Sequence, residues 1–503
     1  GVQTGVPAPL QNVTLDIEQG SCVLLCGASG SGKTTLTRLI NGLIPHYWDT
    51  GILEGTVKVD GVDVVSSTLF EISKRVASVF QNPRSQFFNV DVASEVAFTL
   101  ENHGVDVELI KEKVSHAAHV CNVKHLLGCS IFELSGGQKQ KIACACAHAS
   151  DAKIFLFDEP SANLDYLSMR DIHAMMKQLK ESGATVIVAE HRLHWITDLI
   201  DRAIYMENGR VAGDWNGEEF RSFSLSRIDE LGLRPLTAKH FLENAQCLSV
   251  EENNTLRYTQ SDGKSSQQSW RVENLSFTYK HSISGIDIKK LDIQQNKITG
   301  IIGSNGAGKS TFLRCMCGLE KHSSGILVSP DGKKFTGRKR VNQSYMVFQD
   351  VNHQLFTEYL PDEILLSMPI EDEKKADELL EVFSLSEYRQ SHPLGLSGGQ
   401  KQRLAVASAI ASERPLLLFD EPTSGLDSFH MKTVADQLRD LAHLHDKTVL
   451  LVSHDVELLL ACADNIVRLE DGTVTEEWEM NTESARLRLV KIFLEQLGMG
   501  MEG

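Results

Sequence analysis

Two glycine-rich segments, each ending in a lysine and a hydroxyl residue, have the clearest chemistry in this sequence. Both read G-x-x-x-x-G-K-[ST], at 27–34 and at 303–310. Glycines let backbone N–H groups point at phosphate oxygens, and the N-terminus of a following helix adds partial positive charge. The lysine would contact the terminal phosphates and the hydroxyl would hold Mg²⁺. The expected ATP-binding residues are Gly27, Ser29, Gly30, Gly32, Lys33, Thr34 and Thr35 in the first loop, and Gly303, Asn305, Gly306, Gly308, Lys309, Ser310 and Thr311 in the second.

Two consecutive acidic residues follow an apolar run in each half of the chain. They are Asp158 with Glu159, and Asp420 with Glu421. Because ligands bind at the carboxyl ends of parallel strands, each aspartate is expected to position Mg²⁺ through water. Each glutamate is expected to polarise the attacking water, a role typically worth about 10²–10⁴ in rate. The pattern predicts nucleotide hydrolysis in both halves.

The order of these motifs predicts two similar domains. The segment L-S-G-G-Q occurs at 134–138 and 396–400, and each catalytic glutamate follows its serine by 24 residues (159 − 135 and 421 − 397). Buried strands are expected at 22–26 and 298–302 before the phosphate loops, and helices at 34–42 and 310–318 after them. Apolar strands that alternate with helices predict an α/β fold with a mostly parallel sheet covered on both faces. The expected ranges are a first domain at 1–232, a linker at 233–269, a second domain at 270–480 and a C-terminal helix at 481–503.

The composition limits the function classes. A formal net charge of −17 disfavours extended binding to a phosphodiester backbone, so no nucleic acid partner is expected. No apolar run reaches the roughly 18 residues that a membrane-spanning helix needs. The ten cysteines form no C-x-x-C pair and are expected to be reduced apolar residues rather than metal ligands.

Together with a late histidine in each half, these motifs resemble those of ABC-type ATPases over essentially the whole chain. The resemblance implies two tandem domains, each with a P-loop core, a helical subdomain and an antiparallel β subdomain, that pair head to tail. It also implies that the L-S-G-G-Q segment of one half, called the signature, closes over the ATP that the other half binds. Thus Ser397, Gly399 and Gln400 would complete the site of Lys33, and Ser135, Gly137 and Gln138 would complete that of Lys309.

The same resemblance implies the remaining site residues. The histidines would sense the γ-phosphate, and a Q-loop glutamine would touch Mg²⁺ or water and relay closure to a partner. Asp165 and Asp427 resemble D-loop residues, which couple the two sites. The expected catalytic residues are Glu159, Glu421, His191, His454, Gln81 and Gln349, and the expected metal-site residues are Thr34, Gln81, Asp158, Ser310, Gln349 and Asp420.

A finer resemblance lies after the Q-loop glutamines, where FQNPRSQFF (80–88) and FQDVNHQLF (348–356) are similar to the ATPases of energy-coupling factor (ECF) importers. It implies a peripheral position at the cytoplasmic face of the membrane, and as partners a transmembrane coupling protein and a substrate-binding membrane component. The cargo would be a vitamin, a vitamin precursor or a metal ion. The coupling helices of such partners carry arginines. Expected contacts for them are Asp91, Glu95, Asp362 and Glu363, unless these residues are solvated helix caps.

Two other classes of function stay open: a soluble tandem ATPase that acts on ribosomes or DNA, and the ATPase of a conventional ABC transporter. The short polar connector and the absence of paired zinc-type cysteines disfavour the ribosome and DNA classes.

The halves also differ in one aromatic residue. Tyr279, 30 residues before Lys309, is expected to stack on adenine, whereas the matching position before Lys33 is Gln3. We therefore expect weaker ATP binding in the first half. Its N-terminal strand is expected to be missing from the sequence or lost from this domain.

Overall fold

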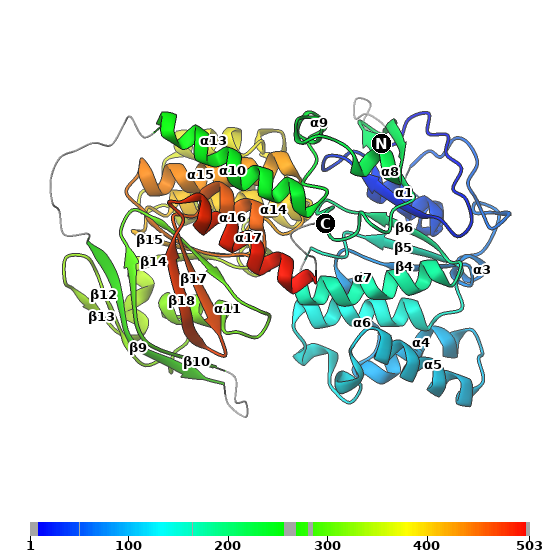
Figure 1. The fold of residues 1–503 in the computed structure, drawn as a ribbon, viewed down its shortest axis with the longest axis horizontal. Coiled ribbons are helices and arrows are strands. Elements are labelled where there is room, and N and C mark those ends of the chain that lie inside the picture. The colour runs from blue at the N-terminus through cyan, green and yellow to red at the C-terminus, as the bar shows by residue number, and fades with distance from the viewer. Residues whose placement is uncertain (1–8, 50, 163, 256–267, 280–284, 499–503) are drawn as a thin grey trace. The chain divides into compact units, whose positions relative to one another are not determined.

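The computed structural model describes residues 9–49, 51–162, 164–255, 268–279 and 285–498. Two compact units make up the chain (Figure 1). The first comprises Gly1–His240 and Leu494–Gly503, and the second Phe241–Phe493. Each unit is considered by itself below.

The first unit is built on a six-stranded sheet with the order β4-β5-β6-β1-β7-β8. Its strands are β1 (Cys22–Cys26), β4 (Val76–Val79), β5 (Ile154–Asp158), β6 (Thr185–Ala189), β7 (Arg202–Glu207) and β8 (Arg210–Asn216). All neighbouring pairs are parallel except β7 with β8. The continuous apolar runs of β1 and β6 are buried along their whole length, as a sheet covered on both faces requires.

The second unit repeats this sheet, with the order β14-β15-β16-β11-β17-β18. Its strands are β11 (Ile298–Ile302), β14 (Ser344–Val347), β15 (Leu416–Asp420), β16 (Thr448–Val452), β17 (Asn465–Glu470) and β18 (Thr473–Glu479). Register agrees as well: β1 pairs with β6 from Cys22 and Val186, and β11 pairs with β16 from Ile298 and Val449. The predicted α/β class is confirmed in both halves.

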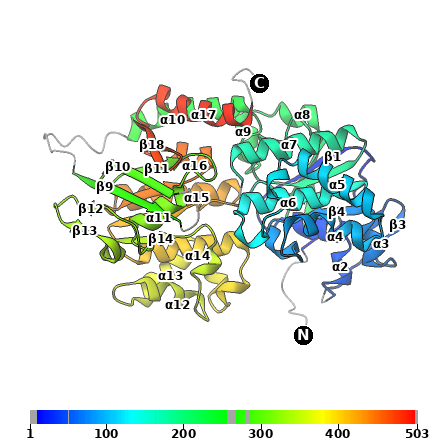
Figure 2. The ribbon, with the colours of Figure 1, turned by 90° about the horizontal axis from the view of Figure 1, so that it is seen from below.

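Helices cover these sheets and form a separate helical subdomain in each unit. In the first unit α4 and α5 pack on α6, and in the second α12 and α13 pack on α14, where Figure 2 shows them together at one side. The first unit has α1 (Lys33–Ile40), α2 (Leu43–His46), α3 (Leu69–Ser73), α4 (Val92–Asn102), α5 (Val107–Val120), α6 (Gly136–Ala149), α7 (Tyr166–Glu181), α8 (Gly217–Arg221) and α9 (Leu225–Glu230). The second has α11 (Lys309–Met316), α12 (Leu360–Ser367), α13 (Glu373–Val382), α14 (Gly398–Ala411), α15 (Ser428–His443), α16 (Val456–Cys462) and α17 (Glu483–Leu497).

The antiparallel subdomain differs between the halves. In the second unit it has four strands in the order β10-β9-β12-β13: β9 (Ser269–Thr278), β10 (Gly285–Gln294), β12 (Ile326–Val328) and β13 (Lys334–Phe335). Among the described residues of the first unit it has two, β2 (Lys58–Val59) and β3 (Val62–Asp63). A Cβ on Gly209 would meet the carbonyl of Pro9, just as one on Gly472 would meet that of Gly285. Pro9 therefore occupies the place of the start of β10. The predicted counterpart of Tyr279, Gln3, lies outside the described residues.

The predicted linker at 233–269 contains a helix, α10 (Ala238–Thr255), that the sequence prediction did not include. Its first turns carry buried apolar side chains, among them Phe241 and Ala245. The predicted C-terminal helix is α17.

The described part of the chain has no helix that is long and apolar enough to cross a bilayer. It contains no group of three or more His, Cys, Asp or Glu side chains placed to hold a metal ion. The cysteines of known placement are free thiols.

A buried arginine fixes the end of the phosphate-loop helix in the second unit. Arg340 donates through Nη1 to the carbonyl oxygen of Cys315 at 2.8 Å, and through Nη2 to that of Ser324 at 2.9 Å and to that of Gly325. The carbonyl at the C-terminal end of α11 gains a charged donor that also suits the helix dipole. Arg340 thus ties α11 to the segment that leads into β12.

We predict that Arg340→Met lowers the free energy of unfolding by about 3 kcal/mol, because the buried carbonyl of Cys315 and the partly buried carbonyls of Ser324 and Gly325 lose a charged donor. Thermal and urea unfolding of the purified chain measure this effect. Arg338→Met, an exposed change in the same short segment, serves as the control and is expected to stay within about 0.5 kcal/mol. Equal stability of the two variants would contradict the role of Arg340.

Candidate functional site

The first phosphate loop follows β1, and at one of its positions only glycine can adopt the backbone conformation. Gly27 has φ 134°, and a Cβ there would lie 2.1 Å from the carbonyl oxygen of Met206. Lys33 begins α1 and is buried, and its Nζ donates to the carbonyl oxygens of Gly27 at 2.8 Å and Ala28 at 2.9 Å. The loop therefore curls around the lysine ammonium at the N-terminus of a helix, an arrangement that can receive phosphate oxygens.

The second loop has the same geometry. Gly303 has φ 154°, and a Cβ there would lie 2.3 Å from the carbonyl oxygen of Leu469. The Nζ of Lys309 donates to the carbonyl oxygens of Gly303 at 2.7 Å and Ser304 at 2.9 Å. Both predicted loops thus have the cradle that a polyphosphate needs.

A hydroxyl and a carboxylate lie together at the end of β5, where Thr34 Oγ1 donates to Asp158 Oδ1 at 3.2 Å. Burial, and then the charge of Glu159, raise the pKa of Asp158 to about 6. In the second unit burial raises the pKa of Asp420, against a hydrogen bond from Ser310. Among the described residues, Asp420 Oδ1 is buried without a hydrogen-bond partner. A buried carboxylate oxygen with a free lone pair beside a hydroxyl fits Mg²⁺, which prefers such hard oxygen ligands.

The glutamates that follow are held in a backbone conformation rare for residues other than glycine. Glu159 has φ 47° and Glu421 has φ 53°, and their N–H groups donate to the carbonyl oxygens of Ala189 at 2.8 Å and Val452 at 2.9 Å. Such strain persists where the surrounding structure fixes it, as at functional sites.

Each predicted histidine lies beside its glutamate. His191 Nε2 is 3.4 Å from Glu159 Oε1, and His454 Nε2 is 3.7 Å from Glu421 Oε1. The Q-loop glutamine also reaches the first glutamate, because Gln81 Nε2 donates to Glu159 Oε2. Gln81 and its counterpart Gln349 are both exposed.

The signature residues begin α6 and α14 and form matching capping boxes. Ser135 Oγ accepts from the N–H of Gln138 at 3.2 Å, and Gln138 Oε1 accepts from the N–H of Ser135 at 2.9 Å. Ser397 and Gln400 repeat this in α14. Gly137 and Gly399 lie in the first turns of these helices. The pairing of each signature with the other half's phosphate loop stays a prediction.

The aspartates predicted for the D-loops begin helices, and the tyrosine predicted to stack on adenine lies beside a phosphate-loop helix. Asp165 and Asp427 cap α7 and α15 by accepting from Ser168 and His430 N–H groups, each at 2.9 Å. Tyr279 OH lies 3.1 Å from Thr311 Oγ1, so its ring stands beside the start of α11.

Two predicted partner contacts are wrong, because Glu95 and Glu363 are only 4% and 3% exposed. Glu95 Oε2 accepts from the N–H groups of Phe88 at 3.0 Å and Asn89 at 2.6 Å. Glu363 Oε2 accepts from those of Phe356 at 2.9 Å and Thr357 at 3.0 Å. They fix the loop after the Q-loop glutamine instead of meeting a partner. The equal spacing from each glutamine (95 − 81 and 363 − 349, both 14) was the signal available in the sequence.

The other two predicted contacts, Asp91 and Asp362, are not buried in this way. Asp362 is exposed, whereas Asp91 caps α4 by accepting from the N–H of Ser94 at 2.9 Å, which lowers the pKa of Asp91.

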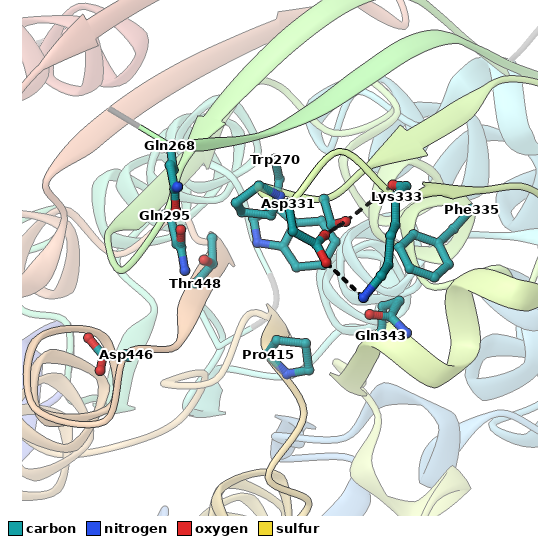
Figure 3. A pocket seen from close by; sticks show the side chains of 12 residues that line it. Gln268, Trp270, Gln295, Asp331, Lys333, Phe335, Gln343, Pro415, Asp446 and Thr448 are labelled. Carbon is teal, nitrogen blue, oxygen red and sulfur yellow. Dashed lines mark hydrogen bonds and ion pairs between the residues drawn. The ribbon is translucent and has the colours of Figure 1, made fainter. Parts of the chain in front are cut away.

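A cavity of about 410 Å³ in the second unit lies away from these residues (Figure 3). Trp270 and the ion pair of Lys333 with Asp331, at 2.8 Å, line it together with Pro415 and Thr448. Pro415 precedes β15 and Thr448 begins β16, so the cavity is at the amino ends of these strands. The phosphate loop is at the opposite, carboxyl edge of the sheet, and the cavity is not part of the candidate site.

Comparison with known proteins agrees with this geometry. Residues 10–162 and 286–424 match the family described as ABC transporter. Two proteins of Treponema denticola described as ABC transporter ATP-binding proteins are 39% and 35% identical. The first alignment covers 93% of both chains, and the second covers 97% of this chain and 96% of the relative. The fold is similar to that in a crystal structure of an archaeal ribosomal stalk protein with the archaeal ribosome recycling factor aABCE1 (TM-score 0.62, 21% identity, covering 97% of this chain and 90% of that one).

We predict that Tyr279→Ala raises the dissociation constant of the second site for ATP by about 10-fold or more, since an aromatic ring stacked on a base is worth about 1–3 kcal/mol. Titration with a fluorescent ATP analogue in a Lys33→Ala background isolates this site. Tyr279→Phe is the control, because it keeps the ring and loses only the contact with Thr311. An unchanged affinity in Tyr279→Ala would disprove the stacking role.

Proposed function

The chain belongs to the ABC transporter family, and from this premise we propose that it energises a membrane importer of the ECF type. It is a tandem ABC ATPase that uses ATP with Mg²⁺. The proposed cargo class is a micronutrient: a vitamin, a vitamin precursor or a metal ion. The proposed partners are a transmembrane coupling protein and a substrate-binding membrane component, reached from the cytoplasmic face.

The proposed chemistry assigns one role to each element of the site. Lys33 and Lys309 bind the terminal phosphates from the loop, while Thr34 and Ser310 with Asp158 and Asp420 hold Mg²⁺, which neutralises phosphate charge when bound. Glu159 and Glu421 take a proton from the attacking water. His191 and His454 lie beside these glutamates and orient the same water or the γ-phosphate oxygens.

The observation that carries the transport proposal is a pair of exposed phenylalanines. Phe88 and Phe356 both stand seven residues after their Q-loop glutamine (88 − 81 and 356 − 349) and are 75% and 73% exposed. Their backbone N–H groups are fixed by Glu95 and Glu363. Large apolar side chains held out to solvent by a built loop mark an interaction site.

Each of these two loops suits a helix with apolar side chains. Glu95 and Glu363 are buried beneath these loops and are not available to pair with arginines of a partner. The proposed contact is therefore mainly apolar. Because the loop begins at the glutamine that, in the first unit, bonds to Glu159, a partner seated on Phe88 can influence hydrolysis directly.

An action on ribosomes is the competing proposal, and the fold similarity to a ribosome recycling factor does not favour it by itself. A ribosomal surface is rich in phosphate, and the formal net charge of −17 opposes binding to it.

We predict that Phe88→Ser combined with Phe356→Ser removes the membrane partner without unfolding the chain. Tagged protein is recovered from detergent-solubilised membranes of its own cells, and copurified integral membrane proteins are identified by mass spectrometry. Wild type is expected to bring down membrane proteins encoded as a transporter, and the double variant to lose them. Leu444→Ser, which changes another exposed apolar side chain (71% exposed), is the matched control and should retain them. Copurification of wild type with ribosomal subunits instead would overturn the transport proposal.

We predict two hydrolytic sites. Glu159→Gln and Glu421→Gln are each expected to reduce ATP turnover, and the double variant to lower it by about 10²-fold or more, because each removes a general base. Phosphate release by the purified chain measures turnover. If Glu159→Gln left turnover nearly unchanged, the first site would not be hydrolytic.

A further inference from the structure

The residue just before each histidine differs between the halves. It is Glu190 after β6 and Ser453 after β16, at the same position relative to the strand end and the histidine. Both side chains are buried and reach the loops around the catalytic glutamates.

In the first unit one carboxylate ties two loops together. Glu190 Oε1 accepts from the N–H groups of His191 at 2.7 Å and Arg192 at 3.1 Å. Its Oε2 accepts from the N–H of Ser161 at 3.3 Å, in the loop after Glu159. The buried carboxylate therefore links the histidine loop to the loop of the catalytic glutamate.

In the second unit the residue after the histidine, and not the residue before it, links the two corresponding loops. Asp455 Oδ2 accepts from Thr423 Oγ1 at 2.9 Å, and Thr423 occupies the position of Ser161 (423 − 161 = 262, the offset between the catalytic glutamates). Ser453 is then free to donate through Oγ to Glu421 Oε2 at 3.4 Å, and the N–H of His454 donates to the same oxygen at 3.1 Å.

The catalytic glutamates are consequently held from different directions. Glu421 Oε2 receives two donors from the histidine loop. In the first unit Glu190 takes the His191 N–H, and Glu159 Oε2 instead receives the side-chain amide of Gln81. Burial, with a smaller contribution from the charge of Glu159, raises the pKa of Glu190, so these two buried carboxyl groups are also electrostatically linked.

We propose that Glu190 is a positioning residue: by accepting the His191 N–H it leaves Glu159 Oε2 to the side-chain amide of Gln81, so that the first ATP site responds to the loop that begins at Gln81 and the second to its own histidine loop. The histidine side chain lies beside the other oxygen, Oε1, in both units. This inference rests on the proposed role of Glu159 and Glu421 as bases. Glu190 acts through His191 and Ser161 and does not touch the nucleotide.

The test measures one site at a time. In a Glu421→Gln background, Glu190→Ser is expected to lower kcat for ATP by about 10-fold, with KM changed less than about threefold, because the base is displaced while the phosphate loop is intact. Adding Arg192→Asp and Ser161→Thr rebuilds the arrangement of the second unit and is expected to recover most of that loss. Failure of the triple change to recover activity, while its melting temperature matches that of Glu190→Ser, would overturn the proposal.

A second comparison avoids buried positions. Gln81→Ala in the Glu421→Gln background is expected to lower kcat about 10-fold more than Gln349→Ala does in the Glu159→Gln background, since Gln81 donates to Glu159 whereas Glu421 receives the Ser453 hydroxyl and the His454 N–H. Equal losses would contradict the proposal even if Glu190→Ser failed to fold. If Glu159→Gln alone had no effect on turnover, the assignment of the base would fail instead, so the two failures are distinguishable.

Discussion

Each half of this chain buries two consecutive carboxylates at the end of one parallel strand, and the loops around the site are organised by that burial. A charged group out of water is destabilising unless donors or cations reach it. Asp158 shows the cost directly, since burial raises its pKa to about 6. The hydroxyl of Thr34, the amide of Gln81 and the histidine loop converge on this strand end because its carboxylates need partners. The residues around the nucleotide site thus supply the hydrogen bonds and charges that stabilise these carboxylates.

The sequence was sufficient for the parts that repeat. Short apolar runs such as 22–26 and 298–302, followed directly by glycine-rich loops, are typical of buried strands, and such a loop has few conformations open to it. The placement of Lys33, Lys309 and both histidines therefore agreed with prediction. The α/β class followed from the alternation of strands and helices over the whole chain.

Other features depend on the direction of a side chain, which the sequence does not state. Glu95 and Glu363 were predicted as exposed acids on a helix, yet their side chains turn inward and accept hydrogen bonds from N–H groups of the preceding loop. Helix α10 went unpredicted because its sequence resembles a polar connector, although Phe241 and Ala245 in its first turns are buried. In both cases tertiary packing decided what local pattern left open.

The two halves also show that different residues can link the same two loops. A carboxylate links the histidine loop to the loop of the catalytic glutamate in both, but it is Glu190 before the histidine in one and Asp455 after it in the other. Because strand order and register match in both units, the fold accommodates this exchange. The exchange changes the acceptor of the histidine N–H, which is Glu190 in the first unit and Glu421 in the second. Two copies of one scaffold can in this way respond to different surroundings, which suits a partner that is itself asymmetric. Fusion into one chain makes such a division of labour stable, since each half is always present with the other in fixed one-to-one proportion.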